Sequence, residues 1–291
     1  MMKRLSLVFL ILLLGIVAAC DEIGYDDDED AIGTDEWHTE TFSADLDDAE
    51  TVIVEFTSTV QAVTIDALNP ASNLLIDGEA EIIGELNFDV NRRNDRTVEL
   101  SEELDDEFYN GDRTLNWTVG INQTIPAELD YTIDAGSAVL TLDDLDLEDF
   151  DLTVNAGTVE AELPESVNEF DSDIRINAGE ATIEAAGMPN VDYDIEVNAG
   201  SLTLDTSAES AIEIEINAGV ATIVVPEGAP VRLTVEQRNG GQVDIAIEGL
   251  VLTEGTPNGE AVYETENFSN FQEDSRVDIT LEINAGVLTV R

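Results

Sequence analysis

The sequence predicts an all-β chain folded as a right-handed parallel β-solenoid with about 21 residues per coil. Two observations predict this fold. Six times the chain repeats a short apolar strand, an Asn-Ala-Gly or Asp-Ala-Gly tripeptide, and a second short strand. The spacing is nearly regular, because the first five motif glycines are 21, 22, 21 and 19 residues apart and the last follows after 67. Fixed periods of this length are typical of repeat architectures. The six glycines are Gly136, Gly157, Gly179, Gly200, Gly219 and Gly286.

Hydrophobic alternation defines the strands on either side of each glycine. Apolar residues lie three and five positions before the glycine and two and four positions after it, with polar residues between them. This period of two indicates strands with one buried and one wet face. The alternation of apolar and polar positions shifts by one residue at the glycine. This shift predicts a bend or bulge there, with glycine supplying unusual backbone angles. We expect the alanine before it to occupy a crowded inner corner.

Two architectures satisfy this pattern. In a solenoid, each unit is one coil stacked at about 4.8 Å on the next, and the asparagines form a ladder. In an antiparallel hairpin array or a sandwich, each motif is a three-residue turn with a left-handed glycine. The solenoid is favoured because equivalent positions of successive copies hold similar residues, which stacked coils would place next to one another. In either case we assign the motif a structural role in turn chemistry and amide stacking, through Asn155, Asn177, Asn198, Asn217 and Asn284 with their glycines.

The remaining segments differ from the repeat. Residues 37–130 contain both tryptophans and several strand-like runs, including Ala80–Val90, and predict a β-rich cap at the start of the repeat domain, residues 131–291. The motif degrades after Pro226, although Asn239-Gly240-Gly241 indicates one more coil. Residues 251–275 resemble an inserted loop, and we expect the final strand to close the structure.

The N-terminus predicts export and lipid anchoring. Residues 1–20 combine two basic residues, an apolar stretch too short for a comfortable membrane span and small residues before Cys20, as in a signal peptide. The run Val17-Ala18-Ala19-Cys20 resembles the bacterial lipobox, which implies that Cys20 is the lipid attachment site. Residues 21–36 carry nine carboxylates and no base, and predict a disordered acidic tether. We therefore expect a protein anchored to a membrane of the bacterial cell envelope, outside the cytoplasm.

Composition excludes several classes of function. The net charge of -54 excludes nucleic acid as a partner and favours cations or cationic partners. One histidine and one cysteine exclude the common nucleophile arrangements and His/Cys zinc sites, and we expect no cofactor. The acidic run Asp26–Asp30 lacks the glycine and ligand spacing of an EF-hand loop, which leaves calcium as a weak possibility. A glycoside-acting enzyme would need only two carboxylates, and 65 are present.

The chain also resembles a known family. Leu115-Asn-Trp, Ile125-Pro126, two Asp/Asn-Ala-Gly motifs and Leu163-Pro164 are similar to the toast-rack proteins. Those are grouped with the DUF4097 and DUF2807 proposed-adhesin repeats and the C-terminal domain of the cell-wall-active antibiotic response family. The resemblance implies a non-enzymatic envelope protein that functions in adhesion, wall contact or envelope-stress partner binding. The alternatives are a polysaccharide-acting enzyme that uses an Asp/Glu pair, or a purely structural surface protein. Outward threonines (Thr182, Thr203, Thr222 and Thr289) are a further candidate surface for a repetitive ligand.

Overall fold

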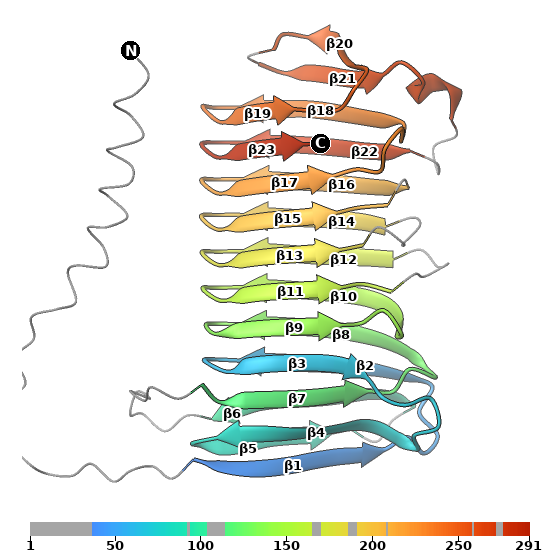
Figure 1. Cartoon of the computed structure of the whole chain (residues 1–291), viewed down its shortest axis with the longest axis vertical. Helices are drawn as coiled ribbons and strands as arrows, with labels where there is room; N and C mark the ends of the chain where they lie inside the picture. Colours follow the sequence, from blue (N-terminus) through green and yellow to red (C-terminus); the bar gives the residue numbers. More distant parts are fainter. Residues whose placement is uncertain are drawn as a thin grey trace, which may run out of the picture. The chain divides into compact units, whose positions relative to one another are not determined.

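The computed structural model describes residues 37–91, 94–103, 114–164, 170–185, 191–207, 209–257, 259–271 and 276–291. The described residues form one unit, Trp37–Arg291, made of two long sheets whose buried sides face each other (Figure 1). The predicted signal peptide, Cys20 and the acidic tether lie outside the described residues.

Sheet A has eleven strands. In spatial order they are β1 (His38–Asp45), β4 (Leu74–Ile82), β7 (Asn116–Ile121), β3 (Ala62–Ala67), β9 (Ser137–Thr141), β11 (Thr158–Glu162), β13 (Glu180–Glu184), β15 (Ser201–Asp205), β17 (Val220–Val224), β23 (Val287–Val290) and β19 (Gln242–Ile245).

Sheet B has twelve strands. In spatial order they are β20 (Leu250–Gly255), β21 (Ala261–Thr265), β18 (Val231–Arg238), β22 (Val277–Ile283), β16 (Ser210–Ile216), β14 (Val191–Val197), β12 (Phe170–Ile176), β10 (Asp146–Val154), β8 (Pro126–Ile133), β2 (Thr51–Ser58), β6 (Asp95–Glu103) and β5 (Glu85–Val90). A short 3-10 helix, η2 (Phe268–Asn270), follows β21.

Each coil consists of one strand from sheet B, a corner and one strand from sheet A. Neighbouring coils pair in parallel and in register, so that Ile174, Ile195 and Ile214 lie side by side on β12, β14 and β16. The β-solenoid prediction is therefore confirmed, and the hairpin-array alternative is wrong because the motif joins strands of two different sheets. The core lies between the sheets and is formed by the inward residues of every coil.

The coils at the two ends are not stacked in chain order. The β2/β3 coil lies between β6/β7 and β8/β9, and the β22/β23 coil lies between β16/β17 and β18/β19. At the C-terminal end the chain skips one coil position, runs through β18 to β21 and returns to occupy that position with β22/β23. At the N-terminal end it forms β2/β3 first, runs outward through β4 to β7 and then passes back beyond β2/β3 to β8. The final strand therefore does not close the structure, and the long interval between Gly219 and Gly286 holds β18 to β21.

Antiparallel strands cover both ends. β1 and β4 extend sheet A at one end, and β5 extends sheet B there. At the other end, the expectation of an inserted loop at residues 251–275 is wrong for its first part, because the hairpin of β20 and β21 occupies Leu250–Gly255 and Ala261–Thr265. The predicted strand Ala80–Val90 is two strands, β4 and β5, which belong to different sheets. Both sheets continue across residue 130 without a break.

The motif corners carry a continuous ladder of side-chain amides. Asn155 Nδ2 donates to Asp134 Oδ1 at 2.7 Å, and each later asparagine donates to the one in the neighbouring coil at 2.6–3.0 Å. The ladder runs through Asp134, Asn155, Asn177, Asn198, Asn217, Asn284 and Asn239. The alanines between them are mostly exposed, so the expected crowded alanine corner is wrong: the asparagine side chains are the more buried ones.

The motif glycines are required by close stacking rather than by unusual backbone angles. Among the six, only Gly136 has a left-handed φ, of +96°. A Cβ placed on Gly179, Gly200, Gly219 or Gly286 would instead lie under 3.0 Å from the carbonyl oxygen of the motif glycine in the coil below. The expectation that glycine supplies unusual backbone angles at the corner therefore holds for Gly136 and is wrong for the other five.

This packing predicts opposite effects for two glycine substitutions. Gly200→Ala should lower the free energy of unfolding by about 1–3 kcal/mol, because its Cβ overlaps the Gly179 carbonyl and Ile176. Gly240→Ala should be neutral or stabilise the protein by about 0.5 kcal/mol, because Gly240 occupies the alanine position of its motif and a Cβ there would make only an ordinary contact, 3.4 Å from the Asn284 carbonyl oxygen. Urea denaturation of both variants tests this; equal losses would contradict the stacking argument.

Candidate functional site

The outer face of sheet B carries a continuous column of acidic side chains. In-register pairing places one outward carboxylate on each of eight neighbouring strands, at a strand spacing of about 4.8 Å. We call these residues the carboxylate column: Asp89, Glu99, Glu55, Asp130, Asp151, Asp173, Asp194 and Glu213. A second row, Glu128, Asp149, Asp171 and Asp192, lies beside its middle.

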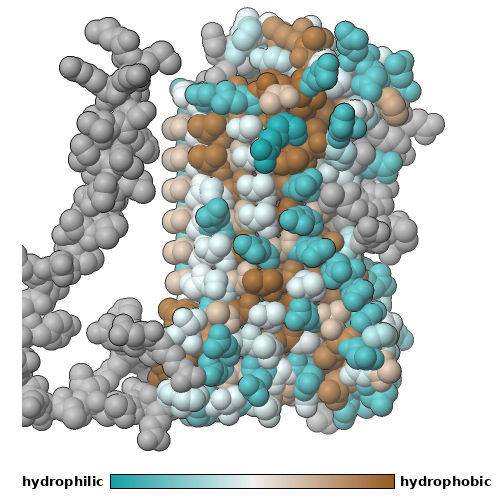
Figure 2. All heavy atoms as spheres, in the orientation of Figure 1, coloured by the Kyte–Doolittle hydropathy of each residue, from teal (hydrophilic) through white to brown (hydrophobic). Residues whose placement is uncertain are grey.

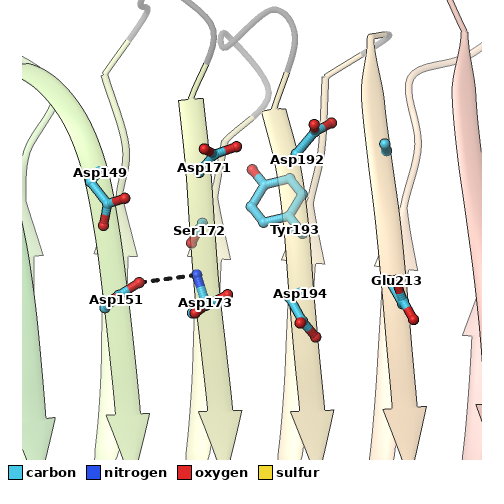
Figure 3. A pocket seen from close by; sticks show the side chains of 10 residues that line it. Asp149, Asp151, Asp171, Ser172, Asp173, Asp192, Tyr193, Asp194 and Glu213 are labelled. Atoms are coloured by element: carbon cyan, nitrogen blue, oxygen red, sulfur yellow. Dashed lines mark hydrogen bonds between the residues drawn. The ribbon is translucent and has the colours of Figure 1, made fainter.

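A shallow hollow of about 540 Å³ lies over β10, β12, β14 and β16 (Figure 3). Six aspartates and Glu213 line it, and the small side chain of Ala211 opens one corner. Figure 3 shows Asp149, Asp171 and Asp192 side by side above Asp151, Asp173 and Asp194. Asp151 accepts a hydrogen bond from the backbone N–H of Asp173 at 3.3 Å. The hollow therefore presents paired rows of carboxylate oxygens to solvent.

Partial burial, together with crowding of like charges, raises the pKa of two aspartates. Partial burial, and then the neighbouring carboxylates of Asp151, Glu128, Asp171 and Asp173, raise the pKa of Asp149 to about 6. Burial also raises the pKa of Asp151. Both causes disfavour the ionised form. At neutral pH this face therefore carries mutual repulsion that a bound cation would relieve.

One basic side chain, Arg175, lies on the outer face of β8 to β16. It forms a 2.8 Å ion pair with Glu196, and its hydrogen bond is the main reason that the pKa of Glu196 is lowered. Tyr193 and Ser172 also border the hollow, but both are buried on the core-facing side of their strands. The Ser172 hydroxyl donates to the Phe150 carbonyl, whereas the Tyr193 hydroxyl has no hydrogen-bond partner within the described part of the chain.

The opposite face, on sheet A, is chemically different. Thr182, Thr203, Thr222 and Thr289 lie in register along β13, β15, β17 and β23. Figure 2 shows this face as a pale central column flanked by apolar patches at its β17 and β23 end, where Val220 is 44% exposed. The two faces of the solenoid thus offer different surfaces, one acidic and one mostly uncharged along its centre.

The sequence singled out the corner residues and missed the carboxylate column. The ten predicted motif residues lie together at one edge of the solenoid, between the two faces, and their polar groups are used in stacking. The sequence does contain a pattern that predicts this column. Three times an Asp-x-Asp tripeptide places its two aspartates eight and six residues before a motif glycine, as Asp149/Asp151, Asp171/Asp173 and Asp192/Asp194. A period of two on an exposed strand, repeated at the coil period, places such residues in columns.

Two kinds of feature are absent from the described residues. Within them, no group of three or more His, Cys, Asp or Glu side chains is arranged to hold a metal ion. No helix among them is long and apolar enough to cross a membrane.

Comparison with known proteins identifies the family. Residues 32–184, more than half of the chain, match the family described as the N-terminal domain of toast_rack, DUF2154, and the chain belongs to this family. None of the curated proteins matches it.

Two solved structures match this chain over most of its length. A proposed cell adhesion protein from Clostridium sporogenes is 16% identical, with a TM-score of 0.44 over 88% of this chain and 99% of the other. A proposed adhesin from Bacteroides fragilis is 8% identical, with a TM-score of 0.41 over 87% of this chain and 97% of the other.

The raised pKa of Asp149 predicts a pH dependence of stability. The folded protein binds the proton of Asp149 up to about pH 6, whereas the unfolded chain releases it near 3.8. The folded state therefore binds more protons in this interval, and its stability falls as the pH rises through it. Lowering the pH from 7.5 to 5 should raise the free energy of unfolding.

Urea denaturation at several pH values measures this effect. Asp149→Asn should flatten the dependence, and Glu180→Gln, on the exposed face of sheet A, should leave it unchanged. A stability that decreases between pH 7.5 and 5 would contradict this account.

Proposed function

We propose that this chain is a non-catalytic, lipid-anchored protein of the bacterial cell envelope that binds positively charged partners on the outer face of sheet B. The observation that carries the proposal is the carboxylate column, in which eight neighbouring strands each contribute one acidic side chain. A rigid row of like charges with regular spacing attracts cations over its whole length and repels anionic polymers. Adhesion to an envelope protein or to a cationic group of a wall polymer is the activity that such a surface suits.

Family membership and the lipobox-like leader support an envelope location. The family match covers the first half of the solenoid, and the two matching solved structures belong to proposed adhesins. The sequence Val17-Ala18-Ala19-Cys20 supports acylation of Cys20, and residues 21–36 would hold the solenoid away from the membrane. Two acyl chains give stable anchoring, whereas one gives marginal binding.

A carbohydrate-acting enzyme is the second candidate. Asp149, with its pKa raised to about 6, has the property required of a general acid. However, partial burial and then the neighbouring carboxylates account for this shift. The hollow is also a shallow depression on a sheet face rather than a cleft that excludes water. Binding therefore explains the repeated arrangement better than catalysis, which would need one distinguished pair.

The binding proposal predicts a face-specific loss. We expect hexalysine to bind the protein in low salt, and the triple variant Asp151→Asn, Asp173→Asn, Asp194→Asn to weaken this binding at least tenfold. The matched control, Glu160→Gln, Glu180→Gln, Glu184→Gln, removes three charges from sheet A and should weaken it less than threefold. Isothermal titration calorimetry measures both, and calcium chloride tested against sodium chloride at equal ionic strength separates a divalent site from screening. Equal losses in the two triple variants would refute a dedicated face.

The anchoring proposal has its own test. Cys20→Ser should move the protein from the membrane to the soluble fraction of the producing bacterium and abolish the incorporation of labelled palmitate. Ala19→Ser keeps the cysteine and a small residue before it, and should retain both. A Cys20→Ser protein that stays with membranes after a high-salt wash would show that another element provides the attachment.

A further inference from the structure

The outermost strand of sheet B at the C-terminal end, β20, has one free edge. It pairs with β21, and no other strand among those described pairs with its opposite side. Figure 1 shows β20 as the last strand of the stack beyond β21. An edge strand presents unpaired backbone N–H and C=O groups that another extended chain can pair with.

This edge is the apolar one among the four sheet ends. Val251 is 48% exposed and Leu252 is 39% exposed. They pair with Glu264 and Tyr263 on opposite faces of the sheet, so both faces of the edge are apolar. At the other three sheet ends, acidic or polar residues hold most of the exposed positions of β1, β5 and β19. Those strands carry the protection that natural edges normally have, and β20 has less of it.

The segment that contains β20 and β21 carries only negative charges. Residues 246–267 contain five glutamates and no other charged residue. Glu264 is paired with Arg232 at 2.9 Å, whereas Glu248, Glu254, Glu260 and Glu266 are exposed. Glu254 and Glu260 also border a hollow of about 520 Å³ that contains two further glutamates, Glu236 and Glu282. A second copy of this chain would bring the same carboxylates against one another, which disfavours self-pairing.

We propose that β20 binds an extended, lysine- or arginine-containing segment of a partner protein as an added strand of sheet B. Main-chain hydrogen bonds to the free edge would supply the affinity, alternating apolar side chains of the segment would cover Val251 or Leu252 on one face of the sheet, and its basic side chains would meet the surrounding glutamates. A bulge between Leu252 and Glu254 limits the regular stretch to Leu250–Leu252, so the paired segment is short. This site is separate from the carboxylate column and does not depend on it.

The test uses a fluorescein-labelled peptide, Lys-Val-Lys-Val-Lys-Val-Lys, with blocked ends, titrated with the purified protein and followed by fluorescence anisotropy. Val251→Lys should weaken binding at least tenfold, because it adds a positive charge and removes the apolar contact at the edge. The matched control is Val139→Lys: Val139 is 47% exposed on β9, which has a neighbouring strand on both sides. This control should weaken binding less than twofold, and both variants should keep the melting temperature of the parent.

Further peptides and variants separate strand addition from charge attraction. A peptide with N-methylated backbone amides keeps the charge and cannot complete the ladder, so it should bind at least tenfold more weakly. Equal weakening by Val251→Lys and Val139→Lys, or equal binding of the N-methylated peptide, would overturn the proposal. Loss of binding in the Asp151/Asp173/Asp194 triple variant, with retention in Val251→Lys, would place the peptide on the carboxylate column instead. Sedimentation of the protein without peptide gives a further check. A dimer that the Val251→Lys substitution dissociates would also overturn the proposal, because the chain paired with β20 would then be a second copy of this protein.

Discussion

The in-register parallel stacking of the coils determines the rest of this structure. Each coil lies about 4.8 Å from the next, so every residue sits directly against its equivalent in the neighbouring coils. At the corner this leaves no space for a Cβ, and the motif glycines follow from that contact. Inside the solenoid it places Ile174 beside Ile195 and Ile214, which packs β-branched side chains in continuous rows. One geometric constraint thus explains both the regular period along the chain and the residue types at each position of the period.

The same register also aligns the outward side chains in columns. There its effect on stability depends on the residue type, and for carboxylates it is unfavourable. Asparagines in a column can hydrogen-bond to one another, because each amide has both a donor and an acceptor. Carboxylates in a column only accept hydrogen bonds and repel one another, which contributes to the raised pKa values of Asp149 and Asp151. The core must offset this repulsion in every coil. A feature that opposes stability in the unliganded protein is well suited to a binding surface, because a cationic partner removes the repulsion when it binds.

The repeat made the structure of a single coil predictable from the sequence, whereas the spatial order of the coils could not be predicted. Alternation before and after each glycine gave the buried positions, and the similarity of successive copies favoured stacking over hairpins. The places of the β2/β3 and β22/β23 coils could not be predicted, because neighbour choice at the ends depends on long-range pairing that leaves no local period. β1 and β20 were missed for a related reason: an antiparallel end strand need not follow the coil pattern. The carboxylate column was predictable, since the Asp-x-Asp pairs recur at fixed distances from the motif glycines, whereas the net charge of -54 contains no information on position.

The asparagine ladder also shows why its one acidic member stands at an end. Asp134 can only accept, so Asn155 must donate to it, and each following amide is then oriented the same way through to Asn239. An aspartate in the middle of the ladder would accept hydrogen bonds from both neighbours, and the amides on one side of it would have to reverse their orientation. Its carboxylate would also be partly buried, as the asparagines in the middle of the ladder are. Beyond Asp134 the next coil, β2/β3, forms its corner differently: the side-chain oxygen of Gln61 accepts the backbone N–H groups of Thr59 and Val60 at 2.7 and 2.9 Å. The ladder therefore begins where the repeat begins, and the acidic first motif, Asp134-Ala-Gly, marks the boundary between the repeated coils and the end of the solenoid that is built from other interactions.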